Sequence, residues 1–226
     1  LDGAGNTVKR EGNIGAPVDL AETTRVVEFN DLEAMEKALA HGDVAAILME
    51  PAMTNIGIVL PLDGYLVGVQ ELAKKYGAYL IIDETHTISV GPGGMTKQLG
   101  LKPDFFTIGK ALAAGIPVGT FGMTQAVADA IKKHVEIEKI DTGGIGGTLA
   151  GNILALAAMR ATLTDVLTEA NFAKMIELGD RWSDGVDAAI KEFGLPWHCN
   201  RLGARGEYIF ASKAPRTGKE AADGGD

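Results

Sequence analysis

Short apolar runs and helical periodicities alternate along most of the chain. The runs are rich in β-branched or aromatic residues and predict buried strands of the kind found in parallel sheets. They lie at 44–49, 79–83, 105–110 and 118–123. Apolar positions three and four residues apart predict helices between the runs. These helices lie at 31–40, 61–76 and 124–133. Strand, helix, strand is the unit of a parallel sheet with right-handed crossovers.

Cap residues and glycines set the expected ends of these helices. Asn30 is expected to cap the first helix, Gly77 to end the second and Thr124 to cap the third. The segment 89–94 is rich in glycine and contains a proline, so it predicts an irregular active-site loop. A second glycine-rich loop is expected at 141–147.

The pattern changes after Asn152. Long helical periodicities at 153–163 and 171–193 lead out of the sheet region, and the division is expected at 163–169. We therefore predict two parts, a large domain at 1–163 and the start of a smaller domain at 164–226. Two strands are expected in the second part, at 197–202 and 207–212, and the polar tail 213–226 is expected to be unstructured.

Two of the predicted strands deliver a charged residue to the sheet's edge. Asp83 ends one strand, and Lys110 ends the next and precedes a stretch of small residues and glycines. Ligands of open α/β sheets bind at the carboxyl ends of the strands. A carboxylate that keeps a pyridine nitrogen protonated and a lysine that forms a Schiff base are the groups that pyridoxal phosphate chemistry requires. Taken singly, each residue has another interpretation: the acid as a turn former, the lysine as a solvated side chain.

An ordered set of motifs gives the chain a family resemblance. These motifs are Val44 to Pro51, Asn55 to Gly57, Ile81 to Glu84, Pro103 to Lys110 and Gly147 to Asn152. In this order the chain resembles the class III aminotransferases, and most of all the branch that contains glutamate-1-semialdehyde aminomutase. The resemblance implies an α/β fold of the aspartate-aminotransferase type (fold type I). It also implies a mostly parallel sheet in the large domain, the start of a smaller α+β domain and a homodimer.

The resemblance also implies roles for individual residues. Lys110 matches the lysine that binds pyridoxal 5'-phosphate and moves the proton during catalysis. Asp83 matches the acid that pairs with the pyridinium nitrogen. Thr85 stands where many members have a valine against the ring, and His86 stands where relatives often have a glutamine near the ring hydroxyl. Thr148 matches a threonine that reaches the cofactor phosphate of the partner subunit.

Several of these residues have plainer interpretations. His86 is equally well explained as a loop histidine that contacts backbone, and Thr148 as a helix cap. Glu50 and Asn55 are substrate-side candidates through the resemblance, although Glu50 also fits a strand-end acid paired with an arginine. The remaining histidines have no spacing to cysteines or acids that predicts a metal site. They are His41, His134 and His198.

The largest departure from the family concerns the cofactor phosphate. Class III enzymes are longer, and their phosphate-binding loop and ring-stacking aromatic residue cannot be identified at 1–26. The sequence therefore resembles the middle of an enzyme. We expect a pyridoxal-phosphate-dependent aminotransferase that moves an amino group between an amine or amino acid and a keto acid or aldehyde. The alternatives are a glutamate-1-semialdehyde-type aminomutase or amino-acid racemase that uses the same lysine, and an inactive fragment that acts only as a dimerisation module.

Composition narrows the classes of partner. The chain has 226 residues, 46% hydrophobic content and a formal charge of −9, so a nucleic acid or an anionic membrane is not the expected partner. Its one cysteine, Cys199, gives no disulfide framework within the chain. No apolar run reaches the length of a membrane span, and the first residues lack a signal-peptide layout. We expect a cytoplasmic protein that acts on small molecules.

Overall fold

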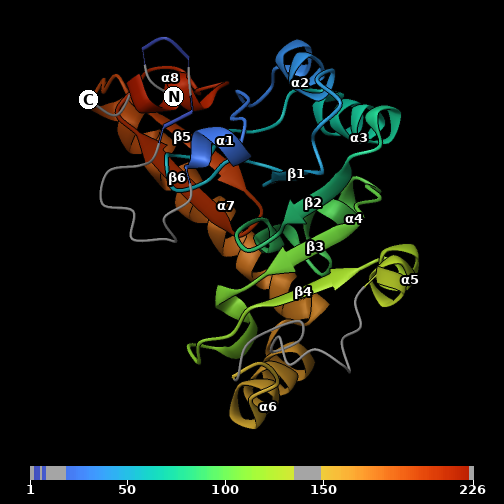
Figure 1. Cartoon of the computed structure of the whole chain (residues 1–226). Helices are drawn as coiled ribbons and strands as arrows, with labels where there is room; N and C mark the ends of the chain where they lie inside the picture. Colours follow the sequence, from blue (N-terminus) through green and yellow to red (C-terminus); the bar gives the residue numbers. More distant parts are fainter. Residues whose placement is uncertain (1–2, 6, 9–18, 135–148, 224–226) are drawn as a thin grey trace.

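The computed structural model describes residues 3–5, 7–8, 19–134 and 149–223 (Figure 1). Its main sheet has the order β1-β2-β3-β4. The strands are β1 (Ala46–Met49), β2 (Tyr79–Asp83), β3 (Phe105–Ile108) and β4 (Thr120–Met123). β1, β2 and β3 are parallel, and β4 pairs antiparallel with β3. The mostly parallel α/β sheet predicted from the sequence is confirmed.

Helices connect these strands. Those of the first part are α1 (Leu20–Thr23), α2 (Leu32–Leu39), α3 (Tyr65–Tyr76), α4 (Gly94–Gln98) and α5 (Gln125–His134). Two short 3₁₀ helices follow the strand ends, η1 (Thr87–Val90) after β2 and η2 (Lys110–Ala113) after β3. The 89–94 segment is therefore more regular than predicted, because η1 and the start of α4 occupy half of it. The second predicted loop, 141–147, lies outside the described residues.

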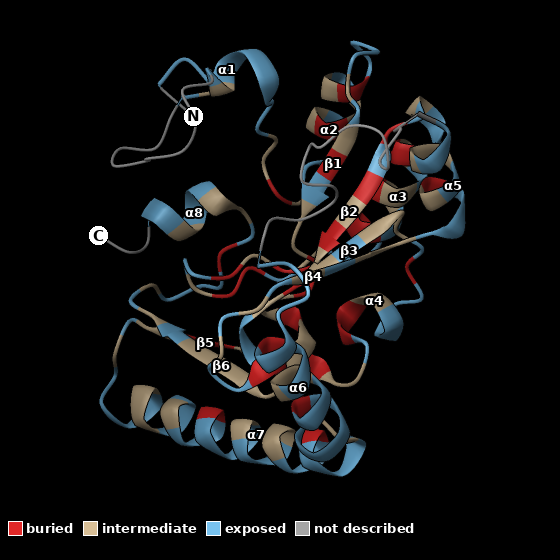
Figure 2. Ribbon diagram, turned by 60° about the horizontal axis from the view of Figure 1, so that its bottom comes forward, coloured by how far each residue is buried: buried red, intermediate tan, exposed pale blue. Residues whose placement is uncertain are grey.

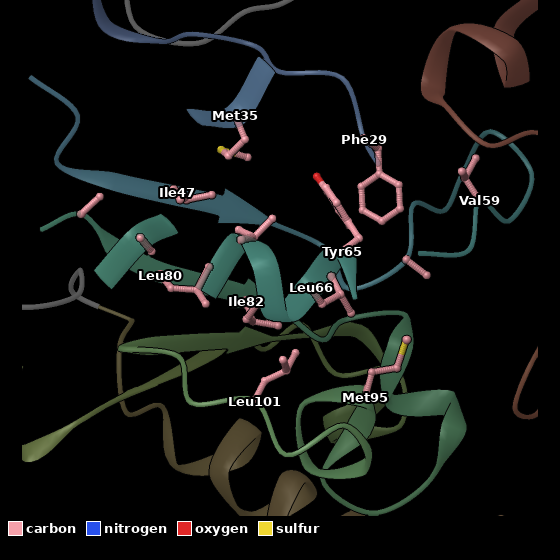
Figure 3. Close-up of a cluster of buried hydrophobic side chains, with 14 of the residues drawn as sticks. Phe29, Met35, Ile47, Val59, Tyr65, Leu66, Leu80, Ile82, Met95 and Leu101 are labelled. Carbon is pink, nitrogen blue, oxygen red and sulfur yellow. The ribbon is translucent and has the colours of Figure 1, made fainter. Parts of the chain in front are cut away.

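One face of the main sheet is buried. Side chains of β1 and β2 pack there with α2 and α3, including Ile47, Leu80 and Ile82 (Figure 3). On the other face Leu48 is 69% exposed. Figure 2 shows buried residues in both β1 and β2. The sequence predicted strands buried on both faces, and this is wrong for the described residues. A short apolar run does not reveal whether one face or both is covered.

α6 (Ile153–Ala161) packs on η2, and the π-helical turn η3 (Thr162–Val166) follows it. The second part of the chain then contains α7 (Glu169–Glu192), β5 (His198–Leu202), β6 (Arg205–Ile209) and α8 (Gly218–Asp223). β5 and β6 form an antiparallel hairpin that packs on α7. The expected unstructured tail is wrong: α8 folds back so that the Gly218 amide donates to Glu28 at 2.7 Å. Among the described helices, none has both the length and the apolar character that a membrane crossing requires.

The helix ends confirm two of the three predicted caps. Gly77 ends α3 in the left-handed conformation, and the Thr124 hydroxyl accepts from the Val127 amide at 3.4 Å. The cap of α2 is Asp31, whose carboxylate accepts from Ala34, and not Asn30. The Asn30 side chain instead bonds the backbone of residues distant in sequence, namely Leu60, Leu62 and Arg216. Both side chains suit an N-cap, and only long-range contacts distinguish them.

The two faces of the main sheet give a first test. Replacing Leu80, which is 2% exposed, with alanine is expected to lower the free energy of unfolding by about 2–5 kcal/mol. The matched change Leu48→Ala on the exposed face is expected to alter it by less than about 0.5 kcal/mol. Urea unfolding of both variants measures the difference. Equal losses would show that the face carrying Leu48 is buried in the protein.

Candidate active site

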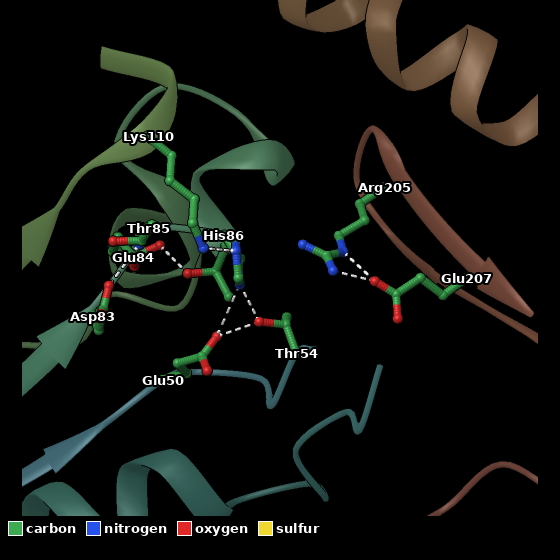
Figure 4. Close-up of polar contacts among 10 residues, drawn as sticks. Glu50, Thr54, Asp83, Glu84, Thr85, His86, Lys110, Arg205 and Glu207 are labelled. Carbon is green, nitrogen blue, oxygen red and sulfur yellow. Dashed lines mark hydrogen bonds and ion pairs between the residues drawn. The ribbon is translucent and has the colours of Figure 1, made fainter. Parts of the chain in front are cut away.

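The parallel strands of the main sheet place three charged residues at one edge. Met49 pairs with Ile82, and Asp83 pairs with Thr107, so the carboxyl ends of β1, β2 and β3 lie side by side. Glu50, Asp83 and Lys110 follow or end these strands. Figure 4 shows their side chains gathered around His86. This edge is where the ligand of an open α/β sheet binds.

His86 links the lysine to the glutamate. Its Nε2 contacts Lys110 Nζ, and its Nδ1 contacts the Thr54 hydroxyl and lies 3.6 Å from Glu50 Oε2. Thr54, which is buried, donates to Glu50 Oε2 at 2.6 Å. A continuous polar chain therefore runs from the carboxylate through the imidazole to the amine. The resemblance placed His86 near the ring hydroxyl of a cofactor, and that role stays a prediction. Thr54 is a member of the polar chain that the sequence reasoning missed.

The backbone at Lys110 is strained. Its φ is 48°, in the left-handed region, and Ala114 at the far end of η2 has the same φ. For a residue other than glycine this conformation costs about 1–2 kcal/mol. Strain of this kind is held by the surrounding structure and clusters at functional sites. The Lys110 side chain is exposed at the sheet edge, and its amine contacts His86.

Asp83 and Thr85 lie beside the lysine. Asp83 Oδ1 accepts from the Thr85 amide at 2.8 Å, and no described residue bonds its second oxygen. A Cβ added to Gly109, the residue before Lys110, would lie 3.9 Å from the Thr85 hydroxyl. The carboxylate therefore retains an oxygen for a ligand, and the threonine lies next to the start of the lysine segment.

Glu84 is a buried carboxylate to which the sequence reasoning gave no role. It is 4% exposed and accepts from Thr87 Oγ1, the Met95 amide, and both the amide and hydroxyl of Thr96, at 2.5–3.1 Å. Donors on every side satisfy the charge, as burial requires. Glu84 thus holds η1 and α4 against the segment that contains Asp83 and His86.

The charges around His86 change its proton affinity. Burial, the positive charge of Lys110 and that of Arg205 lower the pKa of His86, and Glu50 opposes them. The imidazole is therefore neutral at pH 7, because its ordinary pKa is already about 6.5. A neutral imidazole has one donor and one acceptor nitrogen, so it can accept a hydrogen bond from Lys110 and donate one toward Thr54 and Glu50.

One predicted site residue is not joined to this cluster. Asn55 lies in the loop after β1 with a φ of 69°, is exposed, and forms no hydrogen bond with Glu50, His86 or Lys110. Thr148 lies outside the described residues. Within the described part of the chain, no group of three or more histidines, cysteines and acids is placed to hold a metal ion.

Solved structures define the class of fold. A glutamate-1-semialdehyde aminomutase from Pseudomonas aeruginosa PAO1 superposes with a TM-score of 0.93 at 50% identity, over 100% of this chain and 51% of that one. A variant of that protein in which one lysine is replaced by alanine, in complex with PMP, gives the same TM-score, identity and coverage. A β-phenylalanine aminotransferase from Variovorax paradoxus reaches 0.75 at 25% identity, over 86% of this chain and 44% of that one. The fold is therefore fold type I of the pyridoxal-phosphate enzymes.

The sequence comparisons then give the family. The model of the class-III aminotransferases matches residues 12–193, and the chain belongs to this family, which depends on pyridoxal phosphate. A glutamate-1-semialdehyde 2,1-aminomutase from Anaeromyxobacter dehalogenans is 39% identical over 88% of this chain and 45% of the relative. One from Methanocorpusculum labreanum is 38% identical over 92% and 49%. The chain spans about half the length of these relatives.

The pKa of His86 provides a test that needs no ligand. Lys110→Met removes a neighbouring positive charge, so the pKa of His86 is expected to rise. Lys97→Met on α4, which lacks this influence on His86, is the matched control and is expected to leave the pKa unchanged. An NMR titration of the His86 ring resonances measures both. An unchanged pKa in Lys110→Met would contradict the placement of the amine against the imidazole.

Proposed function

We propose that this chain carries the catalytic lysine of a pyridoxal-phosphate-dependent enzyme that transfers amino groups, with Lys110 as that residue. The observation that carries the proposal is the convergence of Asp83, His86 and Lys110 at the carboxyl edge of three parallel strands. Membership of the class-III aminotransferases supports the same cofactor and the same class of chemistry.

The residues present fit the cofactor. Lys110 offers an exposed amine, and Asp83 offers a carboxylate oxygen with no partner among the described residues. Neutral His86, whose Nδ1 donates to Thr54, offers its Nε2 as an acceptor for a ring hydroxyl, and Thr85 lies beside Gly109. An amine, an acid and a neutral hydrogen-bonding group are the groups that a phenolic pyridinium aldehyde requires. When bound, the cofactor supplies an electron sink for cleaving bonds at the carbon that bears the amino group.

The side chains around the lysine would divide the work. Asp83 would hold a proton on the pyridine nitrogen, because a carboxylate favours the charged form of a neighbouring base. Lys110 would bind the cofactor and carry a proton to and from the substrate carbon. His86 would keep the amine oriented, and burial together with the charges of Lys110 and Arg205 would disfavour its protonation against the opposing effect of Glu50. Glu84 would act only through the rigid segment that it holds.

A glutamate-1-semialdehyde-type aminomutase is the second candidate, and the relatives of that name favour it. A mutase moves the amino group within one carbon skeleton and needs no second substrate, whereas a transferase releases a keto product. Mixing the purified protein with an amine donor and no acceptor separates the two. Stoichiometric keto product supports the transferase, and an isomer of the substrate supports the mutase.

The assembly and the division of the chain belong to the same proposal. We assign 1–163 to the cofactor-binding domain and 164–226 to the start of the smaller domain, following the change from the main sheet to the β5–β6 hairpin. A homodimer would place Thr148 near the phosphate of the partner subunit. Crosslinking followed by mass spectrometry of the purified protein tests this contact.

Lys110→Ala tests the central assignment. With added pyridoxal phosphate, the wild type is expected to develop an absorbance band near the visible edge, and borohydride is expected to fix a pyridoxyl group on Lys110. The alanine variant is expected to lose both, since no other described residue at the edge offers an amine there. Lys97→Ala is the control and is expected to retain them. A pyridoxyl group found on another lysine by peptide mass spectrometry would remove Lys110 from this role.

Asp83→Asn tests the acid. The amide cannot hold a proton on the ring nitrogen. The rate of reaction with the amino donor is therefore expected to fall by a factor of about 100 or more, which is the size of general acid–base effects. Binding of pyridoxal phosphate is expected to persist, because Lys110 is unchanged. Absorbance titration and single-turnover kinetics measure the two effects separately. A near-normal rate would show that the electron sink does not depend on Asp83.

A further inference from the structure

An arginine to which the sequence reasoning gave no role lies across from Lys110. Residues on β6 alternate between two faces. Gly206 faces α7, where an added Cβ would come within 2.7 Å of Trp182. Arg205 and Glu207 therefore occupy the opposite face, and their cross-strand partners, Leu202 and Asn200, are buried against the first part of the chain. This face of the hairpin is directed toward the edge of the main sheet.

The hairpin is docked on the segment that carries His86. Ala204 donates its amide to the Ser89 carbonyl at 3.0 Å, and the Ser89 hydroxyl donates to the Leu202 carbonyl at 2.9 Å. Between them, Gly203 comes so close that an added Cβ would lie 2.4 Å from the Ser89 carbonyl oxygen. Arg205 is the next residue along the strand. Its position relative to His86 is therefore set by direct backbone contact.

The guanidinium of Arg205 is oriented and only partly used. Its Nε donates to Glu207 Oε1 at 2.7 Å, and its Nη2 contacts the same oxygen, while Nη1 has no partner among the described residues. The two side chains are 26% and 24% exposed. Figure 4 shows the guanidinium directed toward His86 and Thr54 from the side opposite Lys110. Its charge is close enough to lower the pKa of His86.

We propose that Arg205 is a specificity-determining residue that binds the carboxylate of the substrate whose amino group reacts at Lys110. This inference rests on the proposed function. A planar guanidinium held by a neighbouring acid is suited to a carboxylate, because its remaining donors form a rigid edge. An amino acid or keto acid would then span the distance between the lysine and the hairpin. A substrate without a carboxylate would lack the contact with Arg205 and would keep its other contacts.

Two other uses of the arginine lead to different results. If the Arg205–Glu207 pair served only the hairpin, its loss would cost little, since partly exposed ion pairs contribute modestly, and no anion would depend on it. If Arg205 bound the cofactor phosphate, its loss would weaken the binding of pyridoxal phosphate itself. The experiments below separate these uses from the binding of a carboxylate.

The first experiment measures anion binding without turnover. Succinate is added to the purified protein, and the His86 ring resonances are followed by NMR beside the uncharged diamide, succinamide. The wild type is expected to shift saturably with succinate only. Arg205→Gln is expected to weaken this binding about 10- to 100-fold, the range for a hydrogen bond to a charged group. Binding that is absent in the wild type, or unchanged in Arg205→Gln, overturns the proposal.

The matched control is Arg201→Gln on β5. Arg201 pairs with Asp184 and Asp187 of α7, on the other face of the hairpin, at 2.6 and 2.9 Å. It has the same charge and a similar ion pair but does not face His86. Arg201→Gln is expected to bind succinate as the wild type does. Equal weakening in both variants would show a general charge effect and overturn the proposal.

Kinetics complete the test on the loaded enzyme. Arg205→Gln is expected to raise KM about 10- to 100-fold for an amino acid donor, with little change in kcat and in pyridoxal phosphate affinity. Weaker cofactor binding instead would assign Arg205 to the phosphate and overturn the proposal. The proposed function fails separately, if Lys110 takes up no pyridoxyl group. Arg205-dependent succinate binding would then still establish an anion subsite.

Discussion

The buried carboxylate of Glu84 is the interaction on which the arrangement of this site depends. A charge at this depth is tolerated only because hydroxyl and amide donors from η1 and α4 surround it. These donors come from residues up to 12 positions later, so Glu84 closes the segment after β2 into one rigid unit. Asp83 and His86 lie on either side of it in sequence. Their directions are therefore set by a group that itself performs no chemistry.

The same unit connects the two parts of the chain. η1 begins directly after His86, and its Ser89 is bonded to the β5–β6 hairpin through both its hydroxyl and its carbonyl. The lysine approaches from β3 on one side and the arginine from β6 on the other. The site is thus assembled from strand ends that are neighbours in the main sheet and from a hairpin more than 100 residues farther along, with one fixed segment between them.

Local sequence signals predicted the features that depend on local physics. The strands, the glycine that ends α3 and the acid and lysine at the strand ends follow from apolar runs, backbone freedom and parallel topology. The features that depend on distant partners were missed. Asn30 and Asp31 are equally good caps until Leu60, Leu62 and Arg216 are in place, and the tail became a helix because it meets Glu28. Glu84 and Arg205 gave no periodic or spacing signal. The predicted roles of Thr148 and Asn55 came from resemblance alone.

The close approach of Gly203 to the Ser89 carbonyl gives this position an unexpected weight. Its φ of 60° in the two-residue hairpin turn already favours glycine, because other residues are strained there. Here any side chain would have to push the turn away from η1 and carry the neighbouring strand with it. Gly203 therefore sets the distance between the hairpin and η1, and the close contact with Ser89 excludes a side chain at this position. Gly203 has no functional group, yet it would then be as constrained in evolution as His86 and Arg205, whose separation it maintains.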